Sequence, residues 1–464
     1  MTFPKNFIWG AAAASYQIEG NTQGVDGCGE SVWDMCCKRE GFVKNGDHGF
    51  EACDHYNRYK EDVANMKTMG LQAYRFSVMW PRVIPEGTGK VNQKGLDFYS
   101  RLVDELLDKG ITPWCTLFHW DYPIALFNRG GWLNEDSPLW FEEYSKVIVE
   151  HLSDRVKNWF TLNEPACFIG LGHQDGVHAP GIKLSGGLVN RAWHHAMVAH
   201  GRAVKVIREQ SKLDNPKIGS APCFSTAVPC TESPEDIEAA RNFLFKCKKK
   251  NMWNATWSLD PAFKGSYPED GLKLWGDEAP QIKESDKQYL GLDLDFLGLN
   301  IYSSVCIKAG ENGEPIEVDF PNHHPHTSIG WNVVPEALRW ASKFLYEEYK
   351  KPIIITENGL SLNDWISVDG KCHDPKRIDF LTRYLRGLEK SIDEGTDVMA
   401  YFQWSFIDNF EWAQGYYDRF GLTYMDYKTQ KRTIKDSGHW YKKLADSNGE
   451  ILKEGGEASL YTPF

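Results

Sequence analysis

The chain has 464 residues, with 52 Lys and Arg against 64 Asp and Glu, which gives a formal net charge of −12. This acidic balance argues against a nucleic-acid or anionic-membrane surface, because either needs clustered positive charge. With 42% hydrophobic and 25% charged residues, and no apolar run near the roughly 18 residues of a membrane span, the sequence is typical of a soluble globular protein.

Short runs rich in β-branched and aromatic residues alternate along the chain with longer stretches of helical period. The alternation predicts strands near Phe7–Ala13, Ala73–Val78, Thr112–Phe118, Val156–Leu162, Lys217–Phe224, Asp295–Asn300, Pro352–Thr356 and Val398–Trp404. The clearest helices between them are Asp54–Met69 and Gly95–Lys109, because Gly70 and Gly110 follow them as stop signals.

Strand–helix alternation implies parallel strands joined by right-handed crossovers. Eight such units without an intervening linker favour a closed barrel over an open doubly wound sheet. The predicted class is therefore α/β, with a single (β/α)₈ TIM barrel over residues 1–464. The long segments between some strands would be loops that decorate one face of the barrel.

Cysteine usage and the first residues of the chain bear on the compartment. The 11 cysteines are odd in number and irregularly spaced, and no basic segment at the start leads into an apolar run. We therefore expect reduced thiols in a cytoplasmic protein.

The sequence contains no H-E-x-x-H motif, no P-loop, no G-x-G-x-x-G and no G-x-S-x-G elbow. Two groups of histidines could ligate a metal, but neither has a carboxylate at ligand spacing. These histidines are His194, His195 and His200 in one group, and His323, His324 and His326 in the other. We expect neither a metal nor a cofactor.

Two of the predicted strands end abruptly in a carboxylate. Glu164 follows the fourth strand, and Glu357 follows the seventh. Either glutamate alone could cap the next helix or meet an arginine. Because the carboxyl ends of the barrel strands share one mouth, we expect the two side chains to face each other across it.

Other strand ends add amides, rings and charges to the same mouth. They suit a sugar, whose hydroxyls form hydrogen bonds and whose apolar face lies on an aromatic ring. The fifth strand contributes no such residue. The residues concerned are Gln17, Glu19, Arg75, His119, Trp120, Asn300, Tyr302, Trp404, Glu411 and Trp412.

Two segments, Asn163-Glu164-Pro165 and residues 355–359, resemble the signatures of glycoside hydrolase family 1, the β-glucosidase family. The resemblance covers almost the whole chain, with further matches at residues 7–20, 74–77, 178–181, 404–412 and 419–422. It implies one barrel domain and a retaining β-glycosidase without a cofactor. It also implies cis bonds at Trp404–Ser405 and Ala179–Pro180.

The resemblance assigns a role to each residue. Glu164 would be the acid/base and Glu357 the nucleophile, and Arg75, Asn300 and Tyr302 would orient Glu357. The hydroxyls of the sugar would bind Gln17, His119, Asn163, Glu411 and Trp412. Trp404 would lie beneath the sugar and Trp331 on the leaving-group side. Trp120 and Phe420 complete the predicted substrate-binding set.

Acid/base roles demand different charges on the two glutamates. Arg75 and Tyr302 should hold down the pKa of Glu357, and the charge of Glu357 should raise the pKa of Glu164. By the same family resemblance, the intact Glu411-Trp412 pair implies unphosphorylated sugars, and the presence of Glu164 implies an O-glycosidase rather than a thioglucosidase.

The sequence therefore predicts a retaining β-glucosidase that acts on small β-glucosides and short β-linked oligosaccharides. Two alternatives stay open. One is a β-galactosidase, β-fucosidase or transglycosylase on the same scaffold. The other is a non-catalytic carbohydrate-binding barrel, although such a protein usually loses one of the two glutamates. The oligomeric state is not predicted.

Overall fold

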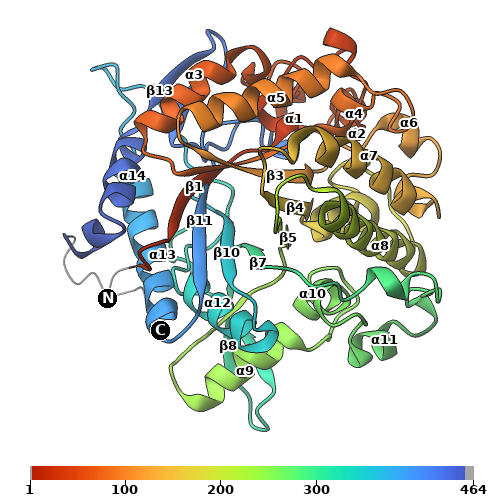
Figure 1. The fold of residues 1–464 in the computed structure, drawn as a ribbon. Coiled ribbons are helices and arrows are strands. Elements are labelled where there is room, and N and C mark those ends of the chain that lie inside the picture. Colours follow the sequence, from red (N-terminus) through yellow and green to blue (C-terminus); the bar gives the residue numbers. More distant parts are fainter. Residues whose placement is uncertain (1–2, 455–464) are drawn as a thin grey trace.

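The computed structural model describes residues 3–454, in which eight parallel strands surround a central axis and helices cover them on the outside (Figure 1). The order around the barrel is β5-β4-β3-β2-β1-β11-β10-β7, so neighbours in sequence are mostly neighbours in space. The predicted α/β barrel is confirmed. Its strands are β1 (Ile8–Ala12), β2 (Ala73–Ser77), β3 (Thr112–Phe118), β4 (Asn158–Asn163), β5 (Lys217–Ala221), β7 (Leu297–Asn300), β10 (Ile353–Asn358) and β11 (Val398–Trp404).

The barrel closes between β5 and β7. The Asp295 amide donates to the Ile218 carbonyl at 2.9 Å, and the Asn300 amide donates to the Pro222 carbonyl at 3.1 Å. Gly298 permits this close approach, because a Cβ atom there would lie 2.3 Å from the Ser220 carbonyl oxygen. The close contact between β5 and β7 therefore requires glycine at position 298.

Helices follow the barrel strands on the outside, as predicted. The two helices predicted from stop signals are α3 and α5, and Gly70 and Gly110 after them have φ of 72° and 71°. The longer helices are α3 (His55–Thr68), α5 (Gln93–Asp108), α7 (Ser137–Leu152), α8 (Gly186–Gln210), α9 (Pro234–Phe245), α12 (Glu336–Tyr349), α13 (Pro375–Asp393) and α14 (Asp436–Asp446).

Long segments after several strands carry smaller elements, as the barrel prediction requires. They hold the sheet β6 (Ala227–Pro229), β8 (Val305–Ala309) and β9 (Pro315–Val318) and the hairpin β12 (Thr423–Asp426) and β13 (Lys431–Ile434). They also hold the short helices α1 (Ser15–Ile18), α2 (Val32–Cys37), α4 (Trp80–Val83), α6 (Ile124–Phe127), α10 (Ala255–Phe263) and α11 (Glu269–Trp275), and the helical segment η4 (Ala166–Asp175).

Aromatic rings fill the interior of the barrel. Trp114 lies 5.7 Å from Phe160, 5.8 Å from Phe296 and 5.4 Å from Phe402, measured between ring centroids. The Arg75 guanidinium lies over Phe160 at 5.0 Å. The packed rings thus occupy the barrel interior, next to the polar side chain of Arg75.

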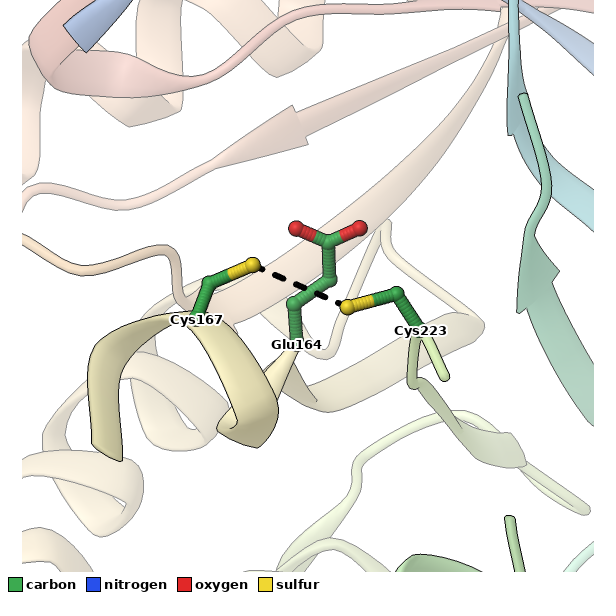
Figure 2. Close-up of side chains that lie close together, drawn as sticks. All are labelled: Glu164, Cys167 and Cys223. Carbon is green, nitrogen blue, oxygen red and sulfur yellow. Dashed lines mark hydrogen bonds between the residues drawn. The ribbon is translucent and has the colours of Figure 1, made fainter. Parts of the chain in front are cut away.

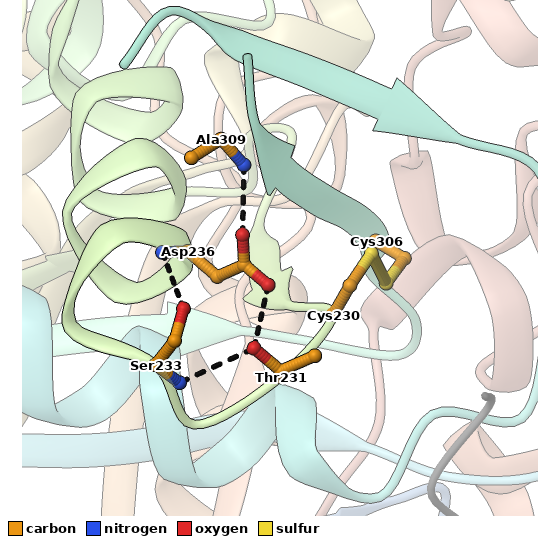
Figure 3. Close-up of a disulfide and its surroundings, with 6 residues drawn as sticks. All are labelled: Cys230, Thr231, Ser233, Asp236, Cys306 and Ala309. Atoms are coloured by element: carbon orange, nitrogen blue, oxygen red, sulfur yellow. Dashed lines mark hydrogen bonds between the residues drawn. A yellow bond between two sulfur atoms is a disulfide. The ribbon is translucent and has the colours of Figure 1, made fainter. Parts of the chain in front are cut away.

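One expectation about cysteine is wrong. We expected only reduced thiols, but Cys230 and Cys306 form a disulfide (Figure 3). The parallel pairing of β6 with β8 brings them together, because the Cys230 amide donates to the Ile307 carbonyl at 2.8 Å. The other nine cysteines are free thiols.

The pair lies beside a network that ties α9 to β8 (Figure 3). Asp236 accepts hydrogen bonds from the Thr231 hydroxyl at 2.7 Å and from the Ala309 amide at 2.8 Å. Ser233 caps the helix by accepting from the Asp236 amide.

Two further expectations concern the backbone and the membrane. The peptide bonds Ala179–Pro180 and Trp404–Ser405 are cis, as the family resemblance implied. Among residues 3–454, no helix is both long and apolar enough to cross a bilayer.

Candidate active site

Two buried glutamates share a cavity of about 580 Å³ at the carboxyl ends of the barrel strands. Glu164 follows β4 directly and is 7% exposed, and Glu357 lies in β10 and is 3% exposed. A cavity of this size is typical of a small-molecule site. The structure therefore places both predicted carboxyl groups at one barrel mouth.

Glu357 is held by two donors, one in β2 and one in the segment that follows β7. Arg75 Nη1 donates to its Oε1 at 2.7 Å, and the Tyr302 hydroxyl donates to its Oε2 at 2.8 Å. Burial nevertheless raises the pKa of Glu357 above its usual value, and Arg75 and Tyr302 oppose that rise. The expected lowering of this pKa is therefore wrong in its net direction, because burial outweighs both partners.

Among residues 3–454, no arginine or lysine pairs with Glu164 in this way. Burial is the largest cause that raises the pKa of Glu164 to about 7, and the charge of Glu357 is the second. Asn300 Nδ2 donates to Glu164 Oε1 at 2.9 Å and opposes the rise. Because Arg75 stabilises the ionised form of Glu357 and Glu164 lacks such a contact, a proton on the pair is favoured on Glu164.

Asn163 connects the nucleophile side to the sugar side of the cavity. Its Oδ1 accepts from Arg75 Nη2 at 2.6 Å, and its Nδ2 donates to His119 Nε2 at 3.1 Å. Burial and the Arg75 charge lower the pKa of His119 well below its usual value, so the ring is neutral. Its Nδ1 then carries a hydrogen, has no partner within residues 3–454, and can donate to a ligand.

A third carboxyl group, that of the half-buried Glu411, also lines the cavity. Gln17 Nε2 donates to the Phe410 carbonyl at 2.8 Å and lies 3.4 Å from Glu411 Oε2. Burial raises the pKa of Glu411 well above its usual value, and the charges of Asp418, Glu357 and Glu164 add to the effect. Carboxyl and amide groups placed in this way suit the vicinal hydroxyls of a sugar.

Indole rings supply the apolar part of the cavity. Trp404 stacks on the His119 ring at 5.8 Å, and Trp120 lies 4.5 Å from Trp412. Trp331 lies 5.1 Å from the Tyr302 ring. Rings of this kind form flat platforms for a pyranose.

Most of the predicted site residues line this cavity. Those that do are His119, Trp120, Glu164, Asn300, Tyr302, Trp331, Glu357, Trp404, Glu411, Trp412 and Phe420. Gln17, Arg75 and Asn163 lie behind it and contact residues that line it. Glu19 does not line the cavity. Its Oε2 accepts a hydrogen bond from Arg82 Nε at 2.8 Å instead.

The sequence did not identify two thiols beside Glu164. Cys167 lies three residues after Glu164 in η4, and Cys223 follows β5, the strand from which we predicted no site residue (Figure 2). The i, i+3 spacing of Glu164 and Cys167 was a usable signal, whereas nothing in the sequence singles out Cys223.

The histidine groups do not form metal sites within residues 3–454. His194 contacts Tyr267, His195 contacts the Trp132 carbonyl, and His200 contacts Thr161. In the other group, His324 contacts the Val333 carbonyl.

Comparison with known proteins gives consistent matches. Residues 1–450 match the profile of glycosyl hydrolase family 1. The chain is 47% identical over 449 residues to β-glucosidase A of Thermotoga maritima, covering 96% of this chain and 98% of the relative. It is 38% identical over 472 residues to the bifunctional β-D-glucosidase/β-D-fucosidase of Bifidobacterium breve, covering 96% of this chain and 98% of that relative.

Solved structures agree with the sequence matches. The β-glucosidase from Thermotoga maritima in complex with glucoimidazole superposes with a TM-score of 0.88 at 46% identity, covering 97% of this chain and 99% of the other.

Proposed function

The chain belongs to glycosyl hydrolase family 1, and from that membership and its site we infer that it is a retaining β-glucosidase. The observation that carries the residue assignment is the pair of buried carboxyl groups in one cavity, of which Glu357 alone pairs with an arginine in the described part of the chain. We propose Glu357 as the nucleophile and Glu164 as the acid/base. We also propose that residues 1–464 form one catalytic domain.

In the first step, a Glu357 carboxylate oxygen attacks the anomeric carbon, and the bond to the leaving oxygen breaks. The electron pair of that bond goes to the leaving oxygen, which takes the proton from Glu164. Tyr302 and Arg75 hold the two Glu357 oxygens in place for the attack. The products of this step are the free aglycone alcohol and a glucosyl ester on Glu357.

In the second step, water attacks the anomeric carbon and the ester bond breaks. Once the ester forms, the charge of Glu357 is gone, so one cause of the high pKa of Glu164 is gone too. Glu164 is then ionised and accepts the proton of the attacking water. Two inversions at the same carbon give retention.

We propose that the substrates are small β-glucosides and short β-linked oligosaccharides. Support comes from the adjacent Glu411 and Gln17 groups, which suit glucosyl hydroxyls, and from the Trp331 ring that lines the cavity, which we propose for the leaving-group side. Activity on β-fucosides is the second candidate, favoured by the name of the Bifidobacterium breve relative. Comparing kcat/KM for aryl β-glucoside, β-galactoside and β-fucoside separates these activities.

A non-catalytic carbohydrate-binding barrel is disfavoured, because both glutamates are present and share the cavity. We also propose the cytoplasm as the compartment, on the basis of nine free thiols. Fractionation of the source cells tests this assignment.

The acid/base assignment is tested with Glu164→Ala. We expect kcat/KM to fall far more for substrates with poor leaving groups than for activated aryl glucosides, because only the former need a proton donor. Equal losses on both types would contradict the role of Glu164.

The nucleophile assignment is tested by trapping the ester. A 2-deoxy-2-fluoro glucoside should label Glu357, and peptide mapping should find the sugar there. A label on another residue would overturn the assignment, and so would turnover by Glu357→Gln at the wild-type rate.

A further inference from the structure

The acid/base candidate has two thiols as neighbours. Cys167 and Cys223 have their sulfur atoms 3.7 Å apart, and one Glu164 carboxylate oxygen and both sulfur atoms all lie within 4.8 Å of one another. Figure 2 shows the three side chains converging, with the carboxyl group above the line between the two sulfurs. Cys167 is 7% exposed, and all three residues line the cavity.

Adjacent strands build this cluster. β4 and β5 pair in parallel, with Asn163 opposite Ala221, and the Glu164 amide donates to the Ala221 carbonyl at 2.9 Å. The turn into η4 brings Cys167 back beside Glu164, and the chain beyond β5 brings Cys223. All three side chains therefore lie within a few residues of the ends of two paired barrel strands, Glu164 and Cys167 after β4 and Cys223 after β5.

The spacing of the sulfur atoms suits a tetrahedral metal centre. With a Zn–S bond of about 2.3 Å, two sulfurs of a tetrahedron lie about 3.8 Å apart. The observed 3.7 Å is close to that edge. Two thiolates and one carboxylate make three protein ligands and leave a fourth position for water. Soft sulfur ligands select Zn²⁺ and similar cations over Mg²⁺ or Ca²⁺.

We propose that Glu164, Cys167 and Cys223 bind a thiophilic divalent cation of the Zn²⁺ or Cd²⁺ type and that the bound cation inhibits the enzyme. On binding, each thiol releases its proton to solvent and forms a metal–sulfur bond, and any proton on the Glu164 carboxyl group is released as well. No oxidation or reduction takes place. Inhibition follows because Glu164 cannot protonate the leaving oxygen while its carboxylate is bound to the metal. This inhibition claim, unlike the binding claim, rests on the proposed function.

Binding is tested on the intact chain with Cd²⁺ alone, by its ultraviolet thiolate charge-transfer absorption. We expect a saturable band in the wild type and in Cys247→Ser, a half-buried cysteine whose sulfur contacts Asn254 instead. We expect the band to be lost in Cys167→Ser and Cys223→Ser. An unchanged band in these two variants would overturn the site.

A second measurement needs no variant. In the wild type, Cd²⁺ should protect Cys167 and Cys223 from alkylation by iodoacetamide, as mapped by mass spectrometry. Equal alkylation with and without Cd²⁺ would overturn the site even if a serine variant failed to fold.

Inhibition is tested with Zn²⁺ on hydrolysis of an aryl β-glucoside. We expect the same inhibition constant for wild type and Cys247→Ser, and a constant at least about tenfold higher for the Cys167 and Cys223 serine variants. Removing a residue that only hydrogen-bonds to a metal ligand typically weakens metal binding by about 10–100-fold, so removing a ligand itself should weaken it by at least about tenfold. A chelator should restore the rate.

The two claims fail in distinguishable ways. Cysteine-dependent Cd²⁺ binding without Zn²⁺ inhibition would overturn the inhibition claim. Cd²⁺ binding by a wild-type protein that hydrolyses no β-glucoside would overturn the proposed function and leave the binding site standing.

Discussion

Tyr302→Phe removes one hydroxyl from the cavity and keeps the ring. That hydroxyl donates to Glu357 Oε2 at 2.8 Å, whereas the ring contacts Trp331 at 5.1 Å and Phe420 at 6.0 Å. The substitution therefore isolates one hydrogen bond to the proposed nucleophile, because the packing surface is retained.

The size of the effect follows from the charge of the acceptor. A hydrogen bond to a charged group contributes about 1.5–3 kcal/mol. Since this one favours the ionised carboxylate, its loss raises the pKa of Glu357 further, and at about 1.4 kcal/mol per factor of ten it leaves about ten- to a hundredfold less ionised carboxylate at low pH. At pH values below the pKa of Glu357, the ionised fraction of its carboxyl group falls about tenfold for each unit by which that pKa rises.

The assay is kcat/KM against pH for an aryl β-glucoside. We expect the acid limb of Tyr302→Phe to move to higher pH, with a loss of about ten- to a hundredfold on that limb. Tyr349→Phe is the matched control, because the Tyr349 hydroxyl donates to the Asp260 carboxylate at 2.7 Å outside the cavity. An acid limb that stays in place in Tyr302→Phe, or moves equally in both variants, would refute the reasoning.

Three further predictions concern the barrel and the aglycone. Gly298→Ala should lower the Tm measured by differential scanning calorimetry, because the new Cβ would overlap the Ser220 carbonyl oxygen at a cost of about 1–3 kcal/mol. Arg82→Met should lower the free energy of unfolding in urea by about 3–5 kcal/mol, because it leaves the Glu19 carboxylate buried without its cation; a loss below 1 kcal/mol would contradict this. Trp331→Ala should lower kcat/KM for cellobiose about fivefold, the equivalent of about 1 kcal/mol of stacking, and should not lower it for β-glucosyl fluoride, whose leaving group has no ring.

The sequence predicts the barrel strands because their runs are apolar and β-rich over most of their length. Thr112–Phe118 and Val398–Trp404 match the structure at both ends. The strand predicted at Lys217–Phe224 ends earlier, at Ala221, where Pro222 has no amide to donate to a ladder. The sheet of β6, β8 and β9 was not predicted, because its short strands lie inside the long connections.

Site residues could be predicted where they belong to a sequence motif. They could not be predicted where residues distant in the sequence meet only in the folded structure. Glu164 and Glu357 end apolar runs, so their position at the mouth is visible in the sequence. Cys223 is 56 residues from Cys167 and belongs to no pattern, although their sulfur atoms touch. The net rise in the pKa of Glu357 was likewise hidden, because it depends on how completely the folded chain excludes water.

The site also holds backbone conformations that residue types do not reveal. Trp120, Glu164 and Trp412 have φ of 78°, 46° and 50°, in the left-handed region that side chains other than glycine disfavour. Each costs about 1–3 kcal/mol and persists only because surrounding contacts enforce it. For Trp120, one such contact is its indole nitrogen donating to the Asn163 carbonyl at 3.0 Å. The backbone strain at these three residues therefore lowers the free energy of unfolding, and it is found at positions whose side chains line the cavity.

Carboxyl groups that are partly shielded from water impose a second cost, which depends on pH and is tested by Glu411→Gln. Burial and the charges of Asp418, Glu357 and Glu164 raise the pKa of Glu411, so between its unfolded and folded pKa values the native state keeps a proton that the unfolded state has lost. Wild-type stability from this group therefore falls as pH rises through that window, by about 1.4 kcal/mol per unit. Because glutamine does not ionise, the variant should have a higher Tm than wild type near pH 7 and no advantage at about pH 4, the unfolded value. Glu40→Gln, at an exposed position, should show no such difference, and a Glu411→Gln advantage that is equal at both pH values would show that the charge of Glu411 is not its cause.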